Sequence, residues 1–461
     1  MESDQSALDD LPFDADAEIS AVPHQVVLGV SCDGHDAAAA LVVDGKVVAA
    51  AEEAKFTRVP LDGSLPVNAV AACLRVAGLN ADVVGAVAFY EKPLNVVDRV
   101  MSTHRRRGPR GLWQWSGEVT DLLGDRLQVG RRIRRMMRSL GASSDVPVRY
   151  LDHHRSHAAA AYFPSPFDHA AVLTFDGVGE WATASIGRGA GHTLDLLEEL
   201  RFPDSVGLVY SFVTEYLGLR GGVDDDIVMG LAPYGQTTYL GQLRELSTIC
   251  TDGSVHVDAA RFGWFTSTGL RRRELHGLLG GPPRSPGGVL TQRDVDLAAS
   301  VQHLLEESVV SSARHAHELT GLRDVCMSGG VARNVVANGR IVWTTPFDRL
   351  WVQPAPGNAG SAVGAALELW FSVERNHRVV SVPDGMSGAL LGPRTMPAEV
   401  DSWIEATGLV STRFDNAGEL HAAVAHRLAD GAVVGWCGGR LEFGANGLGS
   451  RSIFADPRSS A

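Results

Sequence analysis

The chain contains two copies of one pattern, in which an apolar strand leads through a polar loop into a second strand and then into a third. The first copy predicts strands at 26–31, 38–43 and 46–51. The polar loop 32–36 separates the first two strands, and Asp44-Gly45 is typical of a hairpin turn between the last two.

The second copy predicts strands at 170–175 and 182–186, separated by the acidic glycine loop 176–179. A turn at 187–191 then leads to a third strand. Because the same order of elements occurs twice, the sequence predicts a duplicated α/β architecture.

Helical periodicity and short strand-like runs alternate between and after these units. The predicted helices are 67–76, 206–216, 292–319 and 359–373, and the further strands are 324–327 and 350–352. At 461 residues the chain exceeds what one hydrophobic core usually holds, and Pro and Gly concentrate near 381–393. We therefore predict an acidic disordered tail at 1–23, a first domain at 24–378 and a second domain at 383–461.

Charge and composition limit the partners of the protein. The formal net charge of −13 disfavours nucleic acid or an acidic membrane surface, because phosphate binding needs a positive face. The arginine-rich segment 131–138 indicates a solvated helix, or else a grip on an anionic substrate or a partner. No apolar run reaches the roughly 18 residues that span a bilayer. Since the five cysteines form no CxxC pair, we expect reduced thiols and a cytoplasmic protein.

Three residues indicate a divalent-metal site. His153 and His157 lie four apart at the start of an alanine-rich helix, so both imidazoles share one helix face. Paired surface histidines are common, but Asp176 follows a buried strand, where a carboxylate is costly without a partner cation. Together they supply two nitrogens and one anionic oxygen.

Glycine loops after strand-like runs indicate a nucleotide cleft between the two halves. Such loops let the backbone approach phosphates closely, particularly where they lead into a helix N-terminus. Each loop taken singly is also consistent with an ordinary turn or helix cap. The candidates are Gly177 and Gly179 after Asp176, Gly329 and Gly330 before a helix expected near Val331, and Gly357 before the next helix.

Two acidic segments offer candidates for acid/base chemistry. In the run 224–226 one carboxylate could act as a general base if burial raises its pKa, although three adjacent carboxylates usually form a solvated loop or a cap. His35 and Asp36 form a second candidate pair, with a structural imidazole as the alternative for His35.

With these residues in view, the chain resembles the O-carbamoyltransferases of the NodU/CmcH type, which modify antibiotics and nodulation factors. The resemblance runs from about Val26 to the last residues and is carried by motifs in a fixed order. They are HDAAAALVVDGKVVAAAEE (35–53), FYEKPL (89–94), DHHRSHAAAAYFPSPF (152–167), TFDGVGEWATAS (174–185), VMGLAPYG (228–235), SGGVARNVVANGRI (328–341) and VQPAPGNAGSAVGAAL (352–367).

The resemblance implies a duplicated actin/Hsp70-like (ASKHA) domain followed by a YrdC-like α+β domain. In such proteins the second domain joins carbamoyl phosphate to ATP, and the first transfers the carbamoyl group from carbamoyladenylate to a substrate hydroxyl with the help of a bound metal. The expected acceptor is a small secondary metabolite. A site of two histidines with carboxylate and amide favours Fe(II), with Zn(II) or Mn(II) as alternatives.

The resemblance also assigns roles by position. It implies that His153, His157 and Asp176 are metal ligands, with residue 358 as the fourth, and that Asn334 joins the nucleotide loops. His35 is placed near the transfer site, and Asp225 or Asp226 where an acidic residue can serve as base. Arg440 and Arg451 fall in the motif expected to bind carbamoyl phosphate.

This chain departs from the family pattern at several positions. The expected metal aspartate is Asn358, an apolar position in GGVALN is Arg333, and the central arginine of GRMEFGPRALGNRS is Asn446. Losing that guanidinium removes a bidentate phosphate grip. Residues 383–461 correspond to about half of a YrdC-like domain, so we expect little activation of carbamoyl phosphate by this chain alone.

These observations leave three hypotheses. The first is a working O-carbamoyltransferase that uses carbamoyladenylate or another carbamoyl donor. The second is a catalytically impaired homologue, or a partner subunit, in a homo-oligomer or beside a protein that completes the C-terminal domain. The third is a metal-dependent acyltransferase or hydrolase of altered chemistry.

Overall fold

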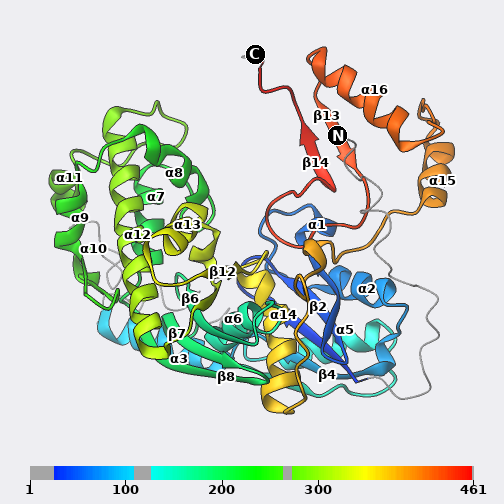
Figure 1. Ribbon diagram of the computed structural model, residues 1–461, viewed down its shortest axis with the longest axis horizontal. Coiled ribbons are helices and arrows are strands. Elements are labelled where there is room, and N and C mark those ends of the chain that lie inside the picture. The colour runs from blue at the N-terminus through cyan, green and yellow to red at the C-terminus, as the bar shows by residue number, and fades with distance from the viewer. Residues whose placement is uncertain (1–24, 108–125, 263–271, 459–461) are drawn as a thin grey trace.

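The computed structural model describes residues 25–107, 126–262 and 272–458, and all structural statements concern these ranges. The acidic stretch predicted to be a disordered tail lies outside them. Two five-stranded mixed sheets form the centre of the molecule, with helices of the second half gathered on one side (Figure 1).

The first sheet has the strand order β3-β2-β1-β4-β5. Its strands are β1 (Val26–Ser31), β2 (Ala38–Val43), β3 (Lys46–Glu52), β4 (Val84–Phe89) and β5 (Val148–Tyr150). The second sheet has the order β12-β11-β6-β7-β8. Its strands are β6 (His169–Phe175), β7 (Ala182–Ala190), β8 (Thr193–Arg201), β11 (Asp324–Ser328) and β12 (Arg349–Val352).

The two sheets repeat one topology. In the first, β1 pairs antiparallel with β2 and parallel with β4. In the second, β6 pairs antiparallel with β7 and parallel with β11 in the same way. The hairpin β2–β3 corresponds to β7–β8, and β5 corresponds to β12. The predicted duplication is therefore confirmed.

One predicted turn is wrong. Residues 187–191 were expected to end the strand that starts at Ala182, yet β7 continues to Ala190. The glycines serve close packing instead: a Cβ on Gly187 would lie 2.9 Å from the carbonyl oxygen of Asp195, and one on Gly189 would lie 2.3 Å from the ring of Tyr162. Only glycine lets a strand pass so close to these groups.

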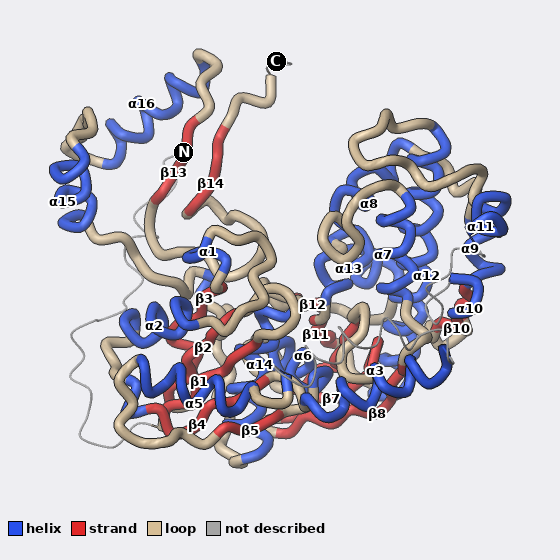
Figure 2. Tube along the Cα trace, turned by 180° about the vertical axis from the view of Figure 1, so that it is seen from behind, coloured by secondary structure: helices blue, strands red, loops and turns tan. Residues whose placement is uncertain are grey.

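Two helices lie near the middle of the molecule, α6 (His153–Tyr162) and α14 (Asn358–Glu368) (Figure 2). α14 packs against α6, β1 and β2. Contact is close because small residues meet: a Cβ on Gly364 would lie 1.7 Å from the Ser156 carbonyl oxygen, and one on Gly29 would lie 1.8 Å from that of Ala362. This packing fixes the start of each helix relative to the other.

The second half is covered by α12 (Gln292–Thr320), which begins with a capping box at Thr291 and Asp294 and packs against α7 and β6. The other helices are α1 (Ala54–Thr57), α2 (Val67–Val76), α3 (Pro93–Arg107), α5 (Val129–Ser139), α7 (Val206–Tyr216), α8 (Asp225–Leu231), α9 (Leu240–Leu246), α10 (Ala259–Phe262), α11 (Arg272–Leu278), α13 (Val335–Thr344), α15 (Pro397–Thr407) and α16 (Ala417–Ala429). Two further antiparallel pairs are β9 (Ser247–Ile249) with β10 (Val255–Val257), and β13 (Val434–Cys437) with β14 (Arg451–Phe454).

A helix predicted to begin near Val331 begins later. Residues Gly330–Arg333 form a single 3₁₀ turn, and α13 starts at Val335 with Asn334 as its cap. The asparagine side chain accepts a hydrogen bond from the Ala337 amide, which satisfies one of the free N–H groups at a helix start. The capping chemistry therefore decides where this helix starts.

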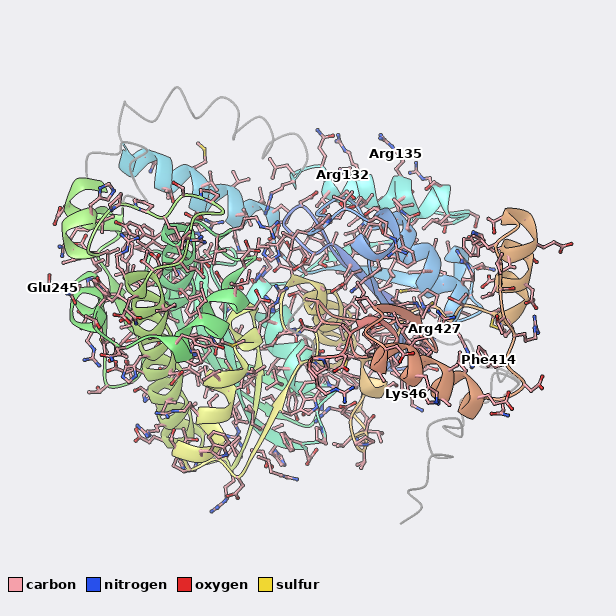
Figure 3. All side chains as sticks on the ribbon, turned by 90° about the horizontal axis from the view of Figure 1, so that it is seen from above. Lys46, Arg132, Arg135, Glu245, Phe414 and Arg427 are labelled. Carbon is pink, nitrogen blue, oxygen red and sulfur yellow. The ribbon has the colours of Figure 1, made fainter. Side chains whose placement is uncertain are left out.

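The arginine-rich segment forms α5, and its two faces differ. Ile133, Met136 and Met137 are buried against the first half. Arg132 and Arg135 lie toward the outer edge (Figure 3), and Arg132 forms an ion pair of 2.7 Å with Asp33. The helix is thus amphipathic, and its ion pair with Asp33 anchors it to the first half.

The C-terminal residues divide between the first half and a projecting part. Met386, Leu391 and Phe443 belong to the core of the first half. In contrast, α15 and α16 bury none of their side chains, and with β13 and β14 they project from the body of the molecule (Figure 1). Within the described residues, none of the helices combines the length and the apolar character needed to cross a bilayer.

Candidate metal centre

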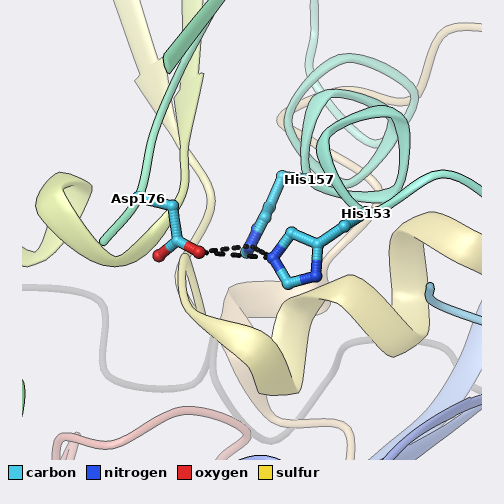
Figure 4. A group of neighbouring side chains, drawn as sticks. All are labelled: His153, His157 and Asp176. Atoms are coloured by element: carbon cyan, nitrogen blue, oxygen red, sulfur yellow. Dashed lines mark hydrogen bonds and ion pairs between the residues drawn. The ribbon is translucent and has the colours of Figure 1, made fainter. Parts of the chain in front are cut away.

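The side chains of His153, His157 and Asp176 converge on one point, as the sequence predicts (Figure 4). The histidines occupy the first turns of α6, and Asp176 directly follows β6. His153 Nε2 lies 3.2 Å from Asp176 Oδ2 and 3.1 Å from His157 Nε2. His157 Nε2 lies 3.9 Å from the same carboxylate oxygen. Two imidazole nitrogens and one carboxylate oxygen therefore point at a common centre.

The electrostatics of this cluster are those of a site that holds positive charge. Burial alone would lower the pKa of His153, but the carboxylates of Asp176 and Glu91 raise it to about 9. Burial, with the neighbouring charge of His153, holds the pKa of His157 well below its usual range. Although burial opposes it, the hydrogen bond from His153 keeps the pKa of Asp176 well below its ordinary value.

The donor set fits a divalent cation. Neutral imidazole and carboxylate are ligands that Zn(II), Fe(II) and Mn(II) accept. The ligand atoms all lie within 4.8 Å of one another, and the two histidine side chains are 5% and 0% exposed. Such a buried group would be costly without either a shared proton or a bound cation.

Backbone and glycine contacts hold Asp176 and His153 in place. The Gly330 amide donates to Asp176 Oδ1 at 3.1 Å. A Cβ on Gly179 would lie 2.6 Å from the His153 ring, and one on Gly329, where φ is +93°, would lie 2.1 Å from the Phe175 carbonyl oxygen. These glycines make room for the candidate ligands, whereas a Cβ on Gly177 would be in ordinary contact with Leu208.

Two serines that the sequence analysis did not single out contact His157. Ser361 Oγ lies 3.2 Å from His157 Nδ1, and Ser328 Oγ lies 3.4 Å from the same atom. Ser328 directly precedes Gly329 in the SGG motif, and Ser361 ends the GNAGS motif that begins at Gly357. Their place in the same motifs as these glycines is the signal that could have found them.

Asn358 contacts His35 rather than the three converging side chains. Its Nδ2 lies 3.4 Å from both His35 Nε2 and the His35 carbonyl oxygen. His35 Nδ1 lies 3.0 Å from Asp36, and Asp36 accepts a 2.8 Å hydrogen bond from Arg333 of the second half. Despite burial, His35 and Arg333 lower the pKa of Asp36 to about 2. We call these four residues the inter-half cluster.

Gly357 lies against the inter-half cluster. A Cβ there would lie 2.7 Å from Arg333 Nη2, so glycine leaves space for the guanidinium. Two departures from the family pattern, Arg333 and Asn358, thus contact one pair of neighbours, His35 and Asp36. The predicted role of Gly357 in nucleotide binding stays a prediction.

The two candidate bases differ in environment. Asp225 is half-buried at the start of α8 and accepts hydrogen bonds from Ser211 Oγ at 2.9 Å and from the Gly222 amide at 3.1 Å. Burial raises its pKa above the usual 3.8. Asp226 is exposed, and its carboxylate accepts a hydrogen bond from the amide of the neighbouring Ile227. Burial and the raised pKa thus distinguish Asp225 from Asp226, and the role of either residue as a general base stays a prediction.

The remaining predicted residues form hydrogen bonds within the protein, and their predicted roles in binding nucleotide and carbamoyl phosphate stay predictions. Asn334 is buried and exchanges hydrogen bonds with Gln302 of α12 at 2.8 and 3.0 Å. Arg440 donates to the carbonyl oxygens of Gly392 and Leu391. Arg451 donates to those of Gly438 and Ser450. The described contacts of both arginines are backbone contacts of the C-terminal residues and β3, apart from a hydrogen bond to Thr395.

Comparison with known proteins places this geometry in a family. The sequence profile described as Carbamoyltransferase N-terminus matches residues 26–367, which include all three converging side chains. The profile described as Carbamoyltransferase C-terminus matches residues 425–461.

Two sequence relatives match most of this chain. The uncharacterized protein sll1178 of Synechocystis is 41% identical over 437 residues, which cover 94% of this chain and 71% of that protein. The nodulation protein NolNO of Sinorhizobium fredii is 33% identical over 436 residues, 92% of this chain and 58% of the relative. A solved structure, component A of the (R)-2-hydroxyglutaryl-CoA dehydratase of Acidaminococcus fermentans, matches 76% of this chain and 100% of its own with 14% identity and a TM-score of 0.41. On the two profiles and these sequence relatives, the chain belongs to the carbamoyltransferase family.

Proposed function

We propose that this protein is an O-carbamoyltransferase that moves a carbamoyl group from carbamoyladenylate to a hydroxyl group of a small secondary metabolite. The observation that carries the proposal is the convergence of His153, His157 and Asp176 within the region that matches the family profile. A relative named as a nodulation protein is consistent with an acceptor outside primary metabolism.

Chemistry explains why such a site is useful. A carbamoyl group is a poor electrophile until it carries a good leaving group such as AMP. A divalent cation held by the three side chains supplies positive charge for the phosphate and carbonyl oxygens of the donor as negative charge develops on them.

The residues of the chain supply the other parts of the reaction. Asp225 takes the proton of the acceptor hydroxyl as the hydroxyl oxygen attacks the carbamoyl carbon, and the bond from that carbon to the phosphate oxygen breaks to release AMP. The hydrogen bond from the Gly330 amide keeps Asp176 turned toward the histidines. His35, fixed by Asp36, stands at the boundary of the two halves to contact the carbamoyl group.

Fold and cofactors form part of the same proposal. The repeated strand order of the two sheets supports an actin/Hsp70-like core, with the nucleotide near the loops at Gly177, Gly179, Gly329 and Gly330. The donor set favours Fe(II), with Zn(II) or Mn(II) as alternatives. ATP and carbamoyl phosphate are the proposed source of the donor, and the projecting C-terminal residues are proposed to belong to a YrdC-like domain.

A second candidate function is that of an impaired homologue or partner subunit. Asn446 stands where the family pattern has arginine, and it is exposed. The chain also spans 58% of the length of NolNO, so the full activity of such relatives is not carried over to it. In this reading another protein makes the carbamoyladenylate.

A transfer assay separates the two functions. The purified chain is incubated with metal, synthetic carbamoyladenylate and a panel of hydroxyl compounds, and carbamoylated product is measured by mass spectrometry. We expect product with at least one acceptor and loss of product in His157→Ala. An absence of product with every acceptor, although metal is bound, would favour the partner role.

A further inference from the structure

The ring nitrogens of His153 face two different carboxylates. Nε2 points at Asp176 and His157, the centre of the proposed metal site. Nδ1 is buried on the other side of the ring, where it has no hydrogen-bond partner among the described residues. The nearest carboxylate oxygen there is Glu91 Oε2, at 3.9 Å.

Glu91 is itself an unusual side chain. It follows β4 in the FYEKPL motif and is 3% exposed. Its Oε1 accepts a 2.9 Å hydrogen bond from Arg126 Nη1, and Arg126 also donates to the Asp33 carbonyl oxygen. A buried carboxylate needs such a partner. The arginine uses one oxygen of Glu91 and leaves Oε2 directed at the imidazole.

The tautomer of His153 connects these facts. When Nε2 gives its lone pair to a cation, a neutral imidazole carries its proton on Nδ1. That N–H then lies in a buried environment in which it needs an acceptor. A carboxylate behind a metal-bound histidine fixes both the tautomer and the ring orientation, and makes the ring a better ligand.

His157 shows the same requirement met in another way. Its Nε2 also faces the centre, and its Nδ1 lies 3.4 Å from Ser328 Oγ. Ser361 Oγ lies almost equally far from both ring nitrogens, 3.2 Å from Nδ1 and 3.3 Å from Nε2. Each candidate ligand therefore has a polar group on its Nδ1 side, a carboxylate for His153 and a hydroxyl for His157. The two histidines are not equivalent, because only one has an anionic partner.

We propose that Glu91 is a positioning residue for the metal centre: it accepts the Nδ1 proton of His153 and, anchored by Arg126, holds Nε2 toward the cation. This inference rests on the metal site of the proposed function. The proposed effect of Glu91 on the cation is exerted through the imidazole of His153.

The experiment measures Co(II) binding by its visible absorption in the purified full chain. In Glu91→Gln we expect the dissociation constant to rise by about 10–100-fold, with an altered Co(II) spectrum, because the amide is a weaker and neutral acceptor. Glu91→Asp should recover part of the affinity. The unfolding temperature of each metal-free variant shows whether the fold is retained.

Glu180→Gln is the matched control. Glu180 is also buried beside α6, and its Oε1 accepts a 3.2 Å hydrogen bond from the His153 amide, while no hydrogen bond or ion pair of the described residues joins its carboxylate to the imidazole. We expect its Co(II) affinity to match that of the wild type. Equal affinity in wild type and Glu91→Gln would overturn the role of Glu91 alone. A wild-type chain that binds no Co(II) would overturn the metal site together with this inference.

Discussion

Asn358 is the residue at which this site differs most from its family pattern. The amide contacts His35, and no described contact joins it to His153, His157 or Asp176. However, Ser361, one turn further along α14, lies 3.3 Å from His157 Nε2, the nitrogen that faces the centre. Because residues three apart share a helix face, a side chain at 358 can turn toward the same centre.

Restoring the carboxylate should therefore strengthen the metal site. We expect Asn358→Asp to lower the metal dissociation constant by about tenfold or more, because ligand charge tunes affinity at such sites. Isothermal titration with Zn(II) measures the change. If the variant shows no gain, the first turn of α14 does not supply a ligand.

A second residue-level prediction concerns Asp225. Since burial raises its pKa above 3.8, the carboxylate forms fully only above that raised value. Transfer by the wild type should decline as the pH falls through it. Asp225→Asn should lose about 100-fold or more in rate at neutral pH. Rates with carbamoyladenylate at several pH values provide the measurement.

The contribution of this carboxyl to the stability of the fold should rise as the pH falls, whereas the transfer rate declines. The unfolded chain ionises this carboxyl at lower pH than the folded one, so its ionisation opposes folding as the pH rises through the folded pKa. Asp225→Asn should then unfold at a higher temperature than the wild type at neutral pH.

An unchanged rate of carbamoyl transfer in Asp225→Asn would assign the general base to another residue.

The candidate ligands could be predicted from the sequence because their signals are local. The four-residue spacing of His153 and His157 and the acidic loop at Asp176 are properties of short segments. Glu91 and Ser361 could not be ranked, because their importance comes from contacts across the fold, 62 positions from His153 in one case and 204 from His157 in the other. Burial and ring orientation decide these contacts.

At the scale of elements, the crossing of α6 and α14 positions the histidines. Gly364 lets the backbones meet, since a Cβ there would lie 1.7 Å from the Ser156 carbonyl oxygen. An alanine-rich helix at His153 and His157 was predicted without an end. The helix predicted at 359–373 begins at Asn358 as α14, ends at Glu368 and continues as a π-helix over Leu369–Val373. Their close approach could not be predicted, because it depends on Gly364 of α14 meeting Ser156 and Ala160 of α6 in three dimensions.

Gly364→Ala tests this crossing. Overpacking of this kind costs about 1–3 kcal/mol, and we expect a lower unfolding temperature and weaker metal binding, because α6 must move with both histidines. The matched control is Gly241→Ala on α9, where a Cβ meets nothing within 4 Å. That exposed change should stabilise the protein by about 0.4–1 kcal/mol. Unaltered stability and metal affinity in Gly364→Ala would show that α6 and α14 are not in contact as described.

At the scale of the whole molecule, duplication brings the site together. Asp176 follows β6 of the second sheet, and His35 follows β1, the equivalent strand of the first sheet. The ion pair between Asp36 and Arg333, which lies in the turn after β11, joins the two halves. The repeat predicted two halves, but the pairing of Arg333 with Asp36 depends on how the halves face each other.

The central property of the site is the binding of one divalent cation by His153, His157 and Asp176. The direct measurement is the metal content of the purified chain after reconstitution with Fe(II) or Zn(II) and removal of excess ion, compared with the double variant His153→Ala/His157→Ala. We predict close to one cation per wild-type chain and none retained by the variant. Equal metal content in the two proteins would contradict the assignment of the metal centre.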